Sequence, residues 1–141
     1  MLKSKKRKPK RTTKARKAKR PRPRMPRISE EMKQWSAMLG HELSELPQVS
    51  SRPMFGLRGF YRGKKIFAAL PVTRAIGAAN AFIFRFEPLP AELLELAKKE
   101  PRISAERVLP GARWLSFELN SEEDFRDALW WLNHAYEHAH H

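Results

Sequence analysis

Three arginines and a tyrosine lie within one short string of the sequence, and together they could hold a small anion. Arg52, Arg58 and Arg62 recur at intervals of six and four residues, and Tyr61 stands beside the last of them. Guanidinium groups stay charged and carry five N–H donors, so they suit carboxylate and phosphate groups. We expect these four residues, with amides of the intervening loop, to form a ligand or anion pocket.

Two glycines in the same string offer a structural alternative. Gly56-Leu-Arg-Gly59 is not a phosphate-binding loop, because it lacks the Gly-Lys-Ser/Thr ending and joins two predicted strands instead of opening a helix. The glycines also permit a positive φ or a β-bulge, and Phe55, Phe60 and Tyr61 then pack as ordinary hydrophobic residues. Both interpretations remain open from the sequence.

Histidines gather at the carboxyl end of the chain, where they could ligate a metal. His134 and His138 are four residues apart, about one helical turn, whereas His140 and His141 stand at the end of the chain, where fraying is expected. A metal site needs a third ligand of fixed geometry and the sequence offers none, so we expect no metal site. His41 is interpreted as a surface or packing residue.

The sequence contains no arrangement typical of covalent catalysis. The chain has no cysteine, which excludes a thiolate nucleophile, a thiolate metal site and a disulfide scaffold. None of its serines lies in a nucleophile-elbow context. We therefore expect no catalytic residue and no cofactor, and we favour a non-enzymatic function. The helix dipole explains the acidic residues around the last predicted helix, which are Glu118, Glu122, Glu123, Asp124 and Asp127.

The positive charge of the chain is concentrated at its amino terminus. The net charge is +14, yet residues 1–27 hold 15 of the 29 Lys and Arg residues and no acid. The remainder holds 14 basic residues against 15 acidic ones and is nearly neutral. Because like charges repel, prolines recur and little is apolar, we expect residues 1–28 to be a disordered basic tail before a single domain over residues 29–141.

We expect this tail to contact nucleic-acid phosphates without reading the base sequence. Each Lys or Arg near a phosphate releases about one condensed counterion, and the tail has no aromatic residue for base stacking. Alternatives are a solvated extension, contact with anionic lipid, or a nuclear import signal over residues 5–11. The expected phosphate contacts are Lys5, Lys6, Arg7, Lys8, Lys10, Arg11, Lys14, Arg16, Lys17, Lys19 and Arg20.

No segment of the sequence resembles a membrane span or a secretory signal. The longest stretch without Lys, Arg, Asp or Glu is residues 75–84, ten residues, about half of what a span requires. No apolar region of the kind found in signal peptides follows the amino-terminal charges. We therefore expect a cytoplasmic protein without a membrane span. A protein partner is possible, and the oligomeric state stays open.

The domain is predicted to begin with an amphipathic helix. Ser29 suits its amino-terminal cap, Glu30 and Glu31 suit the positive end of the helix dipole, and Pro47 ends the element. Apolar residues recur at spacings of three and four. They are Met32, Trp35, Leu39, Leu43 and Leu46.

Short alternating segments after this helix predict strands. Residues 49–55 form the first, a bend bracketed by Gly56 and Gly59 follows, and Phe60 starts the second. Residues 65–70 return as a hairpin. Two further strands are predicted. They cover residues 81–86, with Phe82, Phe84 and Phe86 on one face, and residues 113–119, with Leu115, Phe117 and Leu119 on the buried face.

Two more helices complete the predicted order. One covers residues 91–99, and the last opens at a capping box formed by Ser121 and Asp124. Consecutive strands, rather than strict alternation with helices, indicate an α+β fold with an antiparallel sheet of about four to five strands. Aromatic residues interpreted as core, with lining of a small-molecule cleft as the alternative, are Trp114, Trp130, Trp131 and Tyr136.

Two stretches near the end of the chain carry a family pattern. They are Arg107-Val-Leu-Pro-Gly-Ala-Arg-Trp-Leu-Ser-Phe-Glu-Leu119 and Asp124-Phe-Arg-Asp-Ala-Leu-Trp-Trp-Leu-Asn-His-Ala-Tyr136. This part of the chain resembles the end of the bacterial luciferase-domain family, in which a strand of pattern h-v-l-P-x-s-x-W-v-s-F leads to a helix ending A-L-x-L-L-x-x-x-Y. Leu46-Pro-Gln-Val and Arg52-Pro similarly resemble its l-P-g-V-x-x-r-P opening. The resemblance implies a compact α+β domain and carries over neither light emission nor a set of catalytic residues.

A second resemblance overlaps the arginine-containing string. Arg52-Pro-Met-Phe-Gly with residues 61–67 is similar to the R-x-M-F-G-G-x-G-x-Y start of the TfoX amino-terminal domain, itself related in fold to the MmcQ/YjbR proteins. This similarity implies a regulatory role through protein or nucleic-acid contact. The chain departs from many luciferase-domain proteins at Phe55-Gly56, where they have a string containing His and Phe, and its basic tail is not a family requirement.

Two functional hypotheses follow from the sequence. The first is a non-enzymatic binding or regulatory module whose basic tail makes non-specific contacts to nucleic-acid phosphates. The second is a small-molecule-binding or enzymatic domain with a cleft near Arg52, Arg58 and Tyr61, in which the tail is a solubilising extension.

Overall fold

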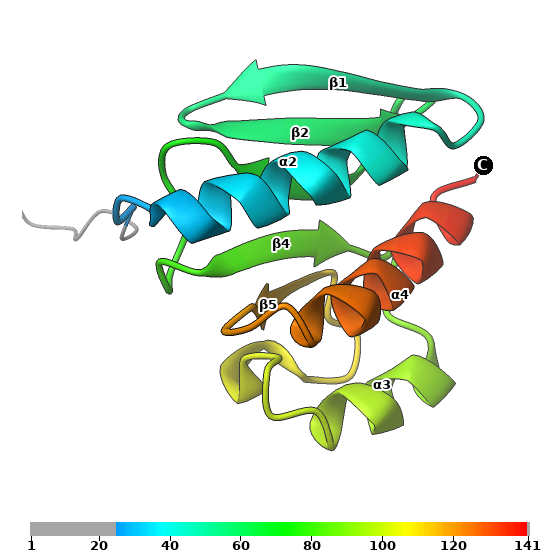
Figure 1. The fold of residues 1–141 in the computed structure, drawn as a ribbon. Coiled ribbons are helices and arrows are strands. Elements are labelled where there is room, and N and C mark those ends of the chain that lie inside the picture. The colour runs from blue at the N-terminus through cyan, green and yellow to red at the C-terminus, as the bar shows by residue number, and fades with distance from the viewer. Residues whose placement is uncertain (1–24, 141) are drawn as a thin grey trace, which may run out of the picture.

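An antiparallel sheet with helices on one face forms the framework of the domain (Figure 1). The computed structural model describes residues 25–140, and predictions on residues 1–24 and on His141 lie outside them. The five strands follow one another across the sheet in chain order, which confirms the α+β fold with an antiparallel sheet. They are β1 (Val49–Met54), β2 (Leu57–Arg62), β3 (Lys65–Pro71), β4 (Ala81–Arg85) and β5 (Trp114–Glu118).

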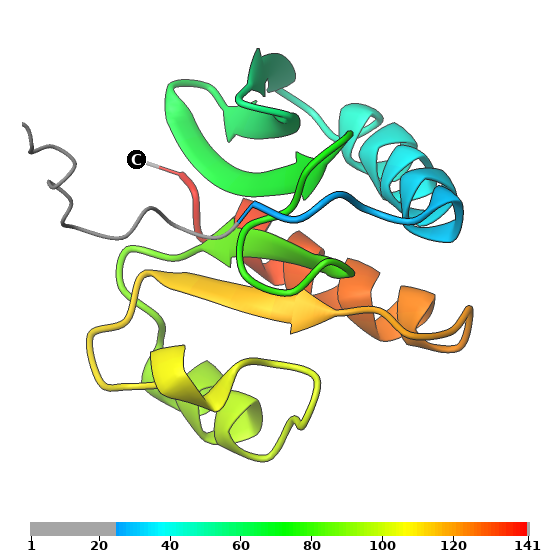
Figure 2. The same ribbon diagram turned by 90° about the vertical axis from the view of Figure 1, so that its left-hand side faces the viewer.

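The helices are distributed between one face of the sheet and one of its edges (Figure 2). Helices α2 (Glu30–Ser44) and α4 (Asp124–Glu137) lie side by side on one face, called here the helix face. Helix α3 (Ala91–Lys98) and the short 3₁₀ helix η3 (Ala105–Arg107) lie beyond β5. Two-residue turns join β1 to β2 and β2 to β3, and residues 72–80 join β3 to β4. The longest connection, residues 86–113 between β4 and β5, contains α3 and η3.

Helix α2 begins and packs as its sequence predicts. The Ser29 hydroxyl accepts a hydrogen bond from the Met32 backbone N–H at 3.0 Å, so Ser29 is the amino-terminal cap. The predicted apolar stripe faces the core, and only its last member, Leu46, is partly exposed. The buried members are Met32, Trp35, Leu39 and Leu43.

The turn between β1 and β2 is tighter than the sequence predicts. It consists of Phe55 and Gly56, which have φ angles of 51° and 85°. Two consecutive residues with positive φ match the right-handed twist of a hairpin. The expected bend over residues 56–59 is therefore wrong, because Gly59 lies inside β2. A Cβ at Gly59 would lie 2.7 Å from the Met54 Sδ, so glycine provides room for its neighbour on β1.

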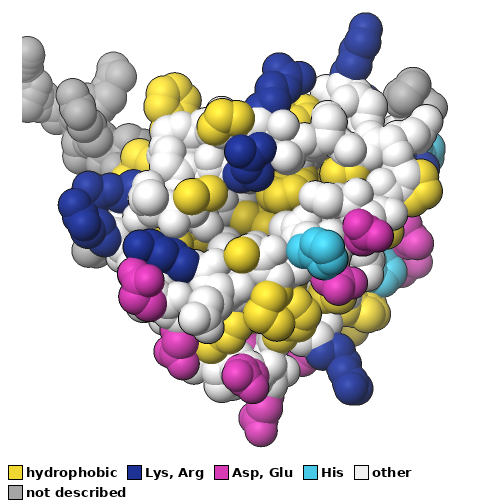
Figure 3. Space-filling view, turned by 45° about the horizontal axis from the view of Figure 1, so that its top comes forward, with side chains coloured by type: hydrophobic (Ala, Val, Ile, Leu, Met, Phe, Trp, Pro, Cys, Tyr) yellow, Lys and Arg dark blue, Asp and Glu magenta, His cyan; other side chains and the backbone are white. Residues whose placement is uncertain are grey.

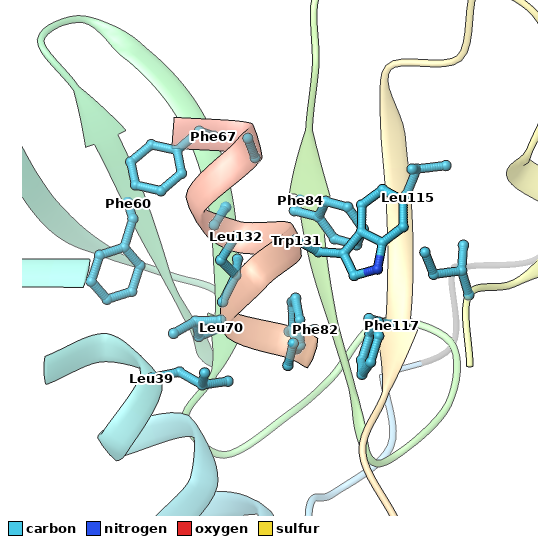
Figure 4. Packing of buried hydrophobic residues seen from close by; sticks show 14 of the residues in the cluster. Leu39, Phe60, Phe67, Leu70, Phe82, Phe84, Leu115, Phe117, Trp131 and Leu132 are labelled. Carbon is cyan, nitrogen blue, oxygen red and sulfur yellow. The ribbon is translucent and has the colours of Figure 1, made fainter. Parts of the chain in front are cut away.

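Aromatic side chains from β4, β5 and α4 fill the core (Figure 4). Phe82 stacks on Phe117 with ring centroids 5.6 Å apart, and Phe84 lies 5.9 Å from Trp131. The predicted alternation of both strands is confirmed, since these phenylalanines are fully buried. Among the tryptophans interpreted as core, Trp131 is buried whereas Trp130 is 42% exposed.

Residues 25–28, predicted as the end of the tail, are attached to the domain. The Ile28 N–H donates to the Thr73 carbonyl at 3.2 Å, and the Ala75 N–H donates to the Pro26 carbonyl at 3.1 Å. Ile28 is buried, and Arg27 pairs with Arg74 as an isolated β-bridge. The ordered domain therefore begins before residue 29, because Ile28 supplies an apolar side chain that the core buries.

One arginine joins the segment after α3 to the start of α4. The Arg102 guanidinium donates to both carboxylate oxygens of Glu100, at 2.7 and 2.8 Å. It also donates to Asp124 and to Asp127, each at 2.8 Å. The backbone carbonyl of Arg102 accepts from the Glu118 N–H at 2.8 Å, so the same residue borders β5. This cluster thus connects three elements that are distant in the sequence.

Hydrogen bonds in this cluster lower two carboxyl pKa values. The Arg102 guanidinium, through its side-chain hydrogen bonds, holds the pKa of Glu100 below its ordinary value. Burial alone would raise the pKa of Asp124, but backbone N–H groups of Asn120 and Ser121 together with Arg102 outweigh it and lower that pKa. The expected capping box is half correct: Asp124 accepts from the Ser121 N–H at 3.1 Å, but α4 begins at Asp124 and not at Ser121.

We predict that Arg102→Leu lowers the free energy of unfolding by about 1–3 kcal/mol at pH 7, because charge-assisted hydrogen bonds are lost and carboxylates keep no cation. The carboxyl groups of Glu100 and Asp124 have lowered pKa values in the folded state. Their contribution to the free energy of unfolding is therefore present above pH 4.5 and is lost as the pH falls through the folded pKa values. Urea denaturation from pH 7 to pH 3 measures this difference.

The matched control for this prediction is Arg126→Leu, which removes an exposed arginine of α4. We expect it to change stability by less than about 0.5 kcal/mol. A gap between wild type and Arg102→Leu that stays constant down to pH 3 would contradict the assigned role of the cluster.

Candidate functional site

A cleft of about 450 Å³ lies between α2 and strands β1 to β3. Figure 3 looks onto the cleft and shows apolar surface at the bottom of the depression with both basic and acidic side chains near it. The helix contributes Lys33, Ser36, Ala37, Gly40, His41 and Ser44 to its lining. The strands and the residue after β3 contribute Ser51, Arg58, Phe60, Leu70, Pro71 and Val72.

The cleft exists because α2 has two unlike sides. Its large apolar stripe turns into the core, whereas the flank beside that stripe carries the small residues Ala37, Gly40 and Ser44. A Cβ at Gly40 would lie 3.1 Å from the Phe60 Cζ and 3.8 Å from the Leu70 Cδ1. Small side chains on this flank therefore leave a hollow beside Phe60 and Leu70, and these two residues are themselves 3% and 2% exposed.

The charged and titratable side chains that line the cleft are all basic. They are Lys33, His41 and Arg58. Lys33 forms an exposed ion pair with Glu30, with the Nζ–Oε2 distance at 2.9 Å. The Arg58 Nη1 donates to the Ser51 Oγ at 2.9 Å, and within residues 25–140 no carboxylate lies within ion-pair distance of Arg58. The open side of the cleft consequently favours a negatively charged group.

A buried hydroxyl borders the same cleft. Ser36 is 6% exposed, and its Oγ has no hydrogen-bond partner in the described part of the chain. A buried polar group without a partner costs about 1–3 kcal/mol relative to one that is paired. Ser36 therefore places an unsatisfied hydroxyl, enclosed by the chain, beside the cleft.

The four residues predicted to share an anion pocket lie in three different places. Arg58 lines the cleft on the helix face, whereas the Arg52 guanidinium lies over the Tyr61 ring at 4.6 Å. Side chains alternate along a strand, so Arg58 and Tyr61, three residues apart on β2, project to opposite faces. The expected pocket is therefore corrected to one that contains Arg58 without Arg52 and Tyr61.

Arg62 has a separate, structural position at the end of α4. Its Nη1 donates to the Tyr136 carbonyl at 3.1 Å, and its guanidinium lies 4.4 Å from the centre of the Tyr136 ring. Cations at the carboxyl end of a helix satisfy its last carbonyl groups and complement its dipole. Arg62 thus ties β2 to α4 and does not line the cleft.

Sequence reasoning missed most of the cleft because its helix residues are small. Ser36, Ala37 and Gly40 carry no charge or aromatic ring, and His41 was interpreted only as a surface or packing residue. The available signal was the clustering of small residues on one side of a helix that is otherwise rich in large apolar residues. These small residues are Ser36, Ala37, Gly40 and Ser44. That pattern predicts a gap wherever the flank faces a sheet.

The point where the described chain begins lies near this cleft. A smaller hollow of about 240 Å³ is lined by Arg27, Ile28, Lys33, Thr73 and Arg74, and Lys33 also lines the cleft. The predicted phosphate-contacting residues 5–20 lie outside the described residues. The described part of the chain therefore begins beside one end of the cleft.

The carboxyl-terminal histidines are engaged with their own helix. The His138 Nδ1 lies 2.8 Å from the His134 carbonyl oxygen, and the His134 ring lies 4.1 Å from the nearest ring centroid of Trp130. Over residues 25–140, no group of three or more His, Cys, Asp or Glu side chains could hold a metal ion. Nor does any helix in that range have the length and apolar character needed to cross a membrane.

Comparison of the chain with protein-family models, with curated proteins and with solved structures found no match. The resemblances to luciferase-domain proteins and to the TfoX amino-terminal domain therefore remain predictions from the sequence. The geometry of the cleft is the basis for assigning a function.

We predict that Ser36→Ala leaves the ligand-free protein as stable as wild type or stabilises it by about 1 kcal/mol, because the change removes an unpaired buried hydroxyl and adds helix propensity. Urea denaturation measures the change. Ser44→Ala is the control, because the Ser44 hydroxyl donates to the Gly40 carbonyl at 2.8 Å. A loss of more than about 1 kcal/mol in Ser36→Ala would show that the hydroxyl has a partner in the folded chain.

Proposed function

We propose that this protein is a binding module for a small organic molecule that lodges between α2 and strands β1 to β3. The observation that carries the proposal is the cleft itself, about 450 Å³ in volume, whose lining combines apolar side chains with the exposed Arg58 guanidinium. Ligand sites are commonly concave, mostly apolar and supplied with a few polar groups, at volumes of roughly 300–1,000 Å³.

The lining supports binding through two kinds of contact. Apolar side chains of the lining, among them Ala37, Leu70 and Val72, contact the body of a ligand, whose own apolar surface gains free energy when it leaves water. Arg58 offers hydrogen bonds that fix its orientation. These contacts hold a ligand without activating it, so we assign binding and not catalysis.

We predict that Ala37→Phe weakens ligand binding at least tenfold. Ala37 is exposed at the cleft, so a benzyl group there occupies the cleft without entering the core. The measurement is a fragment screen on the ¹⁵N-labelled full chain, followed by titration of each binder against wild type and variant.

Met38→Phe is the matched control, because Met38 is the next residue of α2, is 53% exposed and does not line the cleft. It should bind as wild type does. The proposal fails if no fragment perturbs the amides of Ala37, Gly40, Phe60 and Leu70, or if both variants bind equally well.

The sequence favours a second function, located in the tail. We propose that the tail contacts nucleic-acid phosphates without base specificity, since residues 1–27 carry 15 basic residues and no acid. This activity is compatible with a ligand in the cleft, because the two proposals use different residues.

We predict that the full chain binds single- and double-stranded nucleic acid with an affinity that falls steeply between 50 and 200 mM salt, by about a hundredfold or more. Fluorescence anisotropy measures it. The comparison is a chain that begins at Met25, which keeps the contacts of Pro26 and Ile28 with the loop after β3. Equal affinity of the two chains would contradict a role for the tail.

A further inference from the structure

We propose that the ligand of this cleft is an organic carboxylate with an apolar body, whose carboxylate pairs with Arg58. The inference rests on the proposed function and specifies its ligand class. The cleft combines an apolar floor with a lining whose charged and titratable groups are basic without exception.

Arg58 is positioned to receive an anion. Its guanidinium is anchored by one hydrogen bond to Ser51 on the adjacent strand, where β1 and β2 pair in register through Ser51 and Phe60. An arginine has five N–H donors, so most remain for a planar, bidentate acceptor. The residue is exposed, which places the carboxylate at the mouth of the cleft, where its desolvation costs least.

A single carboxylate fits the available charge better than a phosphate group. Lys33, the other permanently charged residue of the lining, already pairs with Glu30 at 2.9 Å. Arg58 is thus the cation that has no carboxylate partner among the described residues of the lining. One unpaired positive charge balances the single negative charge of a carboxylate, whereas a phosphate monoester carries close to two at pH 7.

The cleft offers apolar side chains to the apolar part of the ligand, both at its bottom and at one end. Phe60 and Leu70 form the floor, and Val72, which also lines the cleft, is 49% exposed. The Val72 N–H donates to the Gly56 carbonyl at 2.9 Å, beside the turn at which Phe55 is 87% exposed. Val72 therefore offers exposed apolar surface to the part of an alkyl or aryl body that extends out of the cleft.

The test uses two acid–amide pairs of equal shape, octanoate with octanamide and 4-phenylbutanoate with 4-phenylbutanamide. Each is titrated into the full chain at 0.15 M salt by NMR or calorimetry. We expect the acids to bind at least tenfold more tightly than the amides. Arg58→Gln should remove about that tenfold for the acids and lower the affinity for the amides much less, because a neutral amide forms no ion pair with Arg58.

Arg52→Gln is the matched control, since Arg52 is an exposed arginine of the same hairpin that lies over Tyr61 outside the cleft. It should bind acids as wild type does, and the basic tail is present in every variant. Arg58→Lys keeps the charge without the planar fork and should recover part of the affinity for the acids. Thermal unfolding of each variant verifies that it is folded.

Three outcomes overturn the inference. If the amides bind as tightly as the acids and Ala37→Phe abolishes both, the cleft binds a ligand and only the carboxylate assignment is wrong. If Arg58→Gln and Arg52→Gln weaken the acids equally, general electrostatics explains the preference and the assignment to Arg58 is wrong. If Ala37→Phe changes the binding of neither acids nor amides, the proposed function fails together with the inference.

Discussion

Burial of one sheet face beneath two helices is the constraint on which the rest of this structure depends. The alternation of side chains along a strand places Phe82, Phe84, Leu115 and Phe117 on the helix face. Helices α2 and α4 cover that face with apolar residues spaced three and four apart. Trp131 of α4 packs against Phe84 of the sheet. The small residues of α2, in contrast, leave a cleft between the helix and the sheet.

The cleft is thus a consequence of how two layers meet. A helix packed on a sheet fills the interface only when its large side chains span the whole contact. On α2 the stripe from Met32 to Leu43 spans the half that faces the core, while Ala37 and Gly40 mark the half that faces β1 and β2. Phe60 is 3% exposed and belongs both to the core and to the lining of the cleft.

Local patterns in the sequence predicted the elements and much of the core, but not how the hairpin distributes its arginines. The Ser29 cap, the helical stripe and the alternation of both phenylalanine-rich segments depend on neighbouring residues, and each is confirmed. The face of the sheet on which the Arg58 side chain lies depends on the strand register. Because Gly59 belongs to β2 and not to a bend, the side chains of Arg58 and Tyr61 lie on opposite faces. A grouping by sequence proximity could not reveal this separation.

The attachment of residues 25–28 to the loop after β3 gives the molecule a defined geometry at its charged end. Pro26 and Ile28 are hydrogen-bonded to that loop, and Arg27, Lys33 and Arg74 line one hollow beside it. Lys33 also lines the cleft, so the positive charges of this hollow adjoin it. An anion that reaches the cleft therefore experiences the positive potential of these residues as well as that of Arg58.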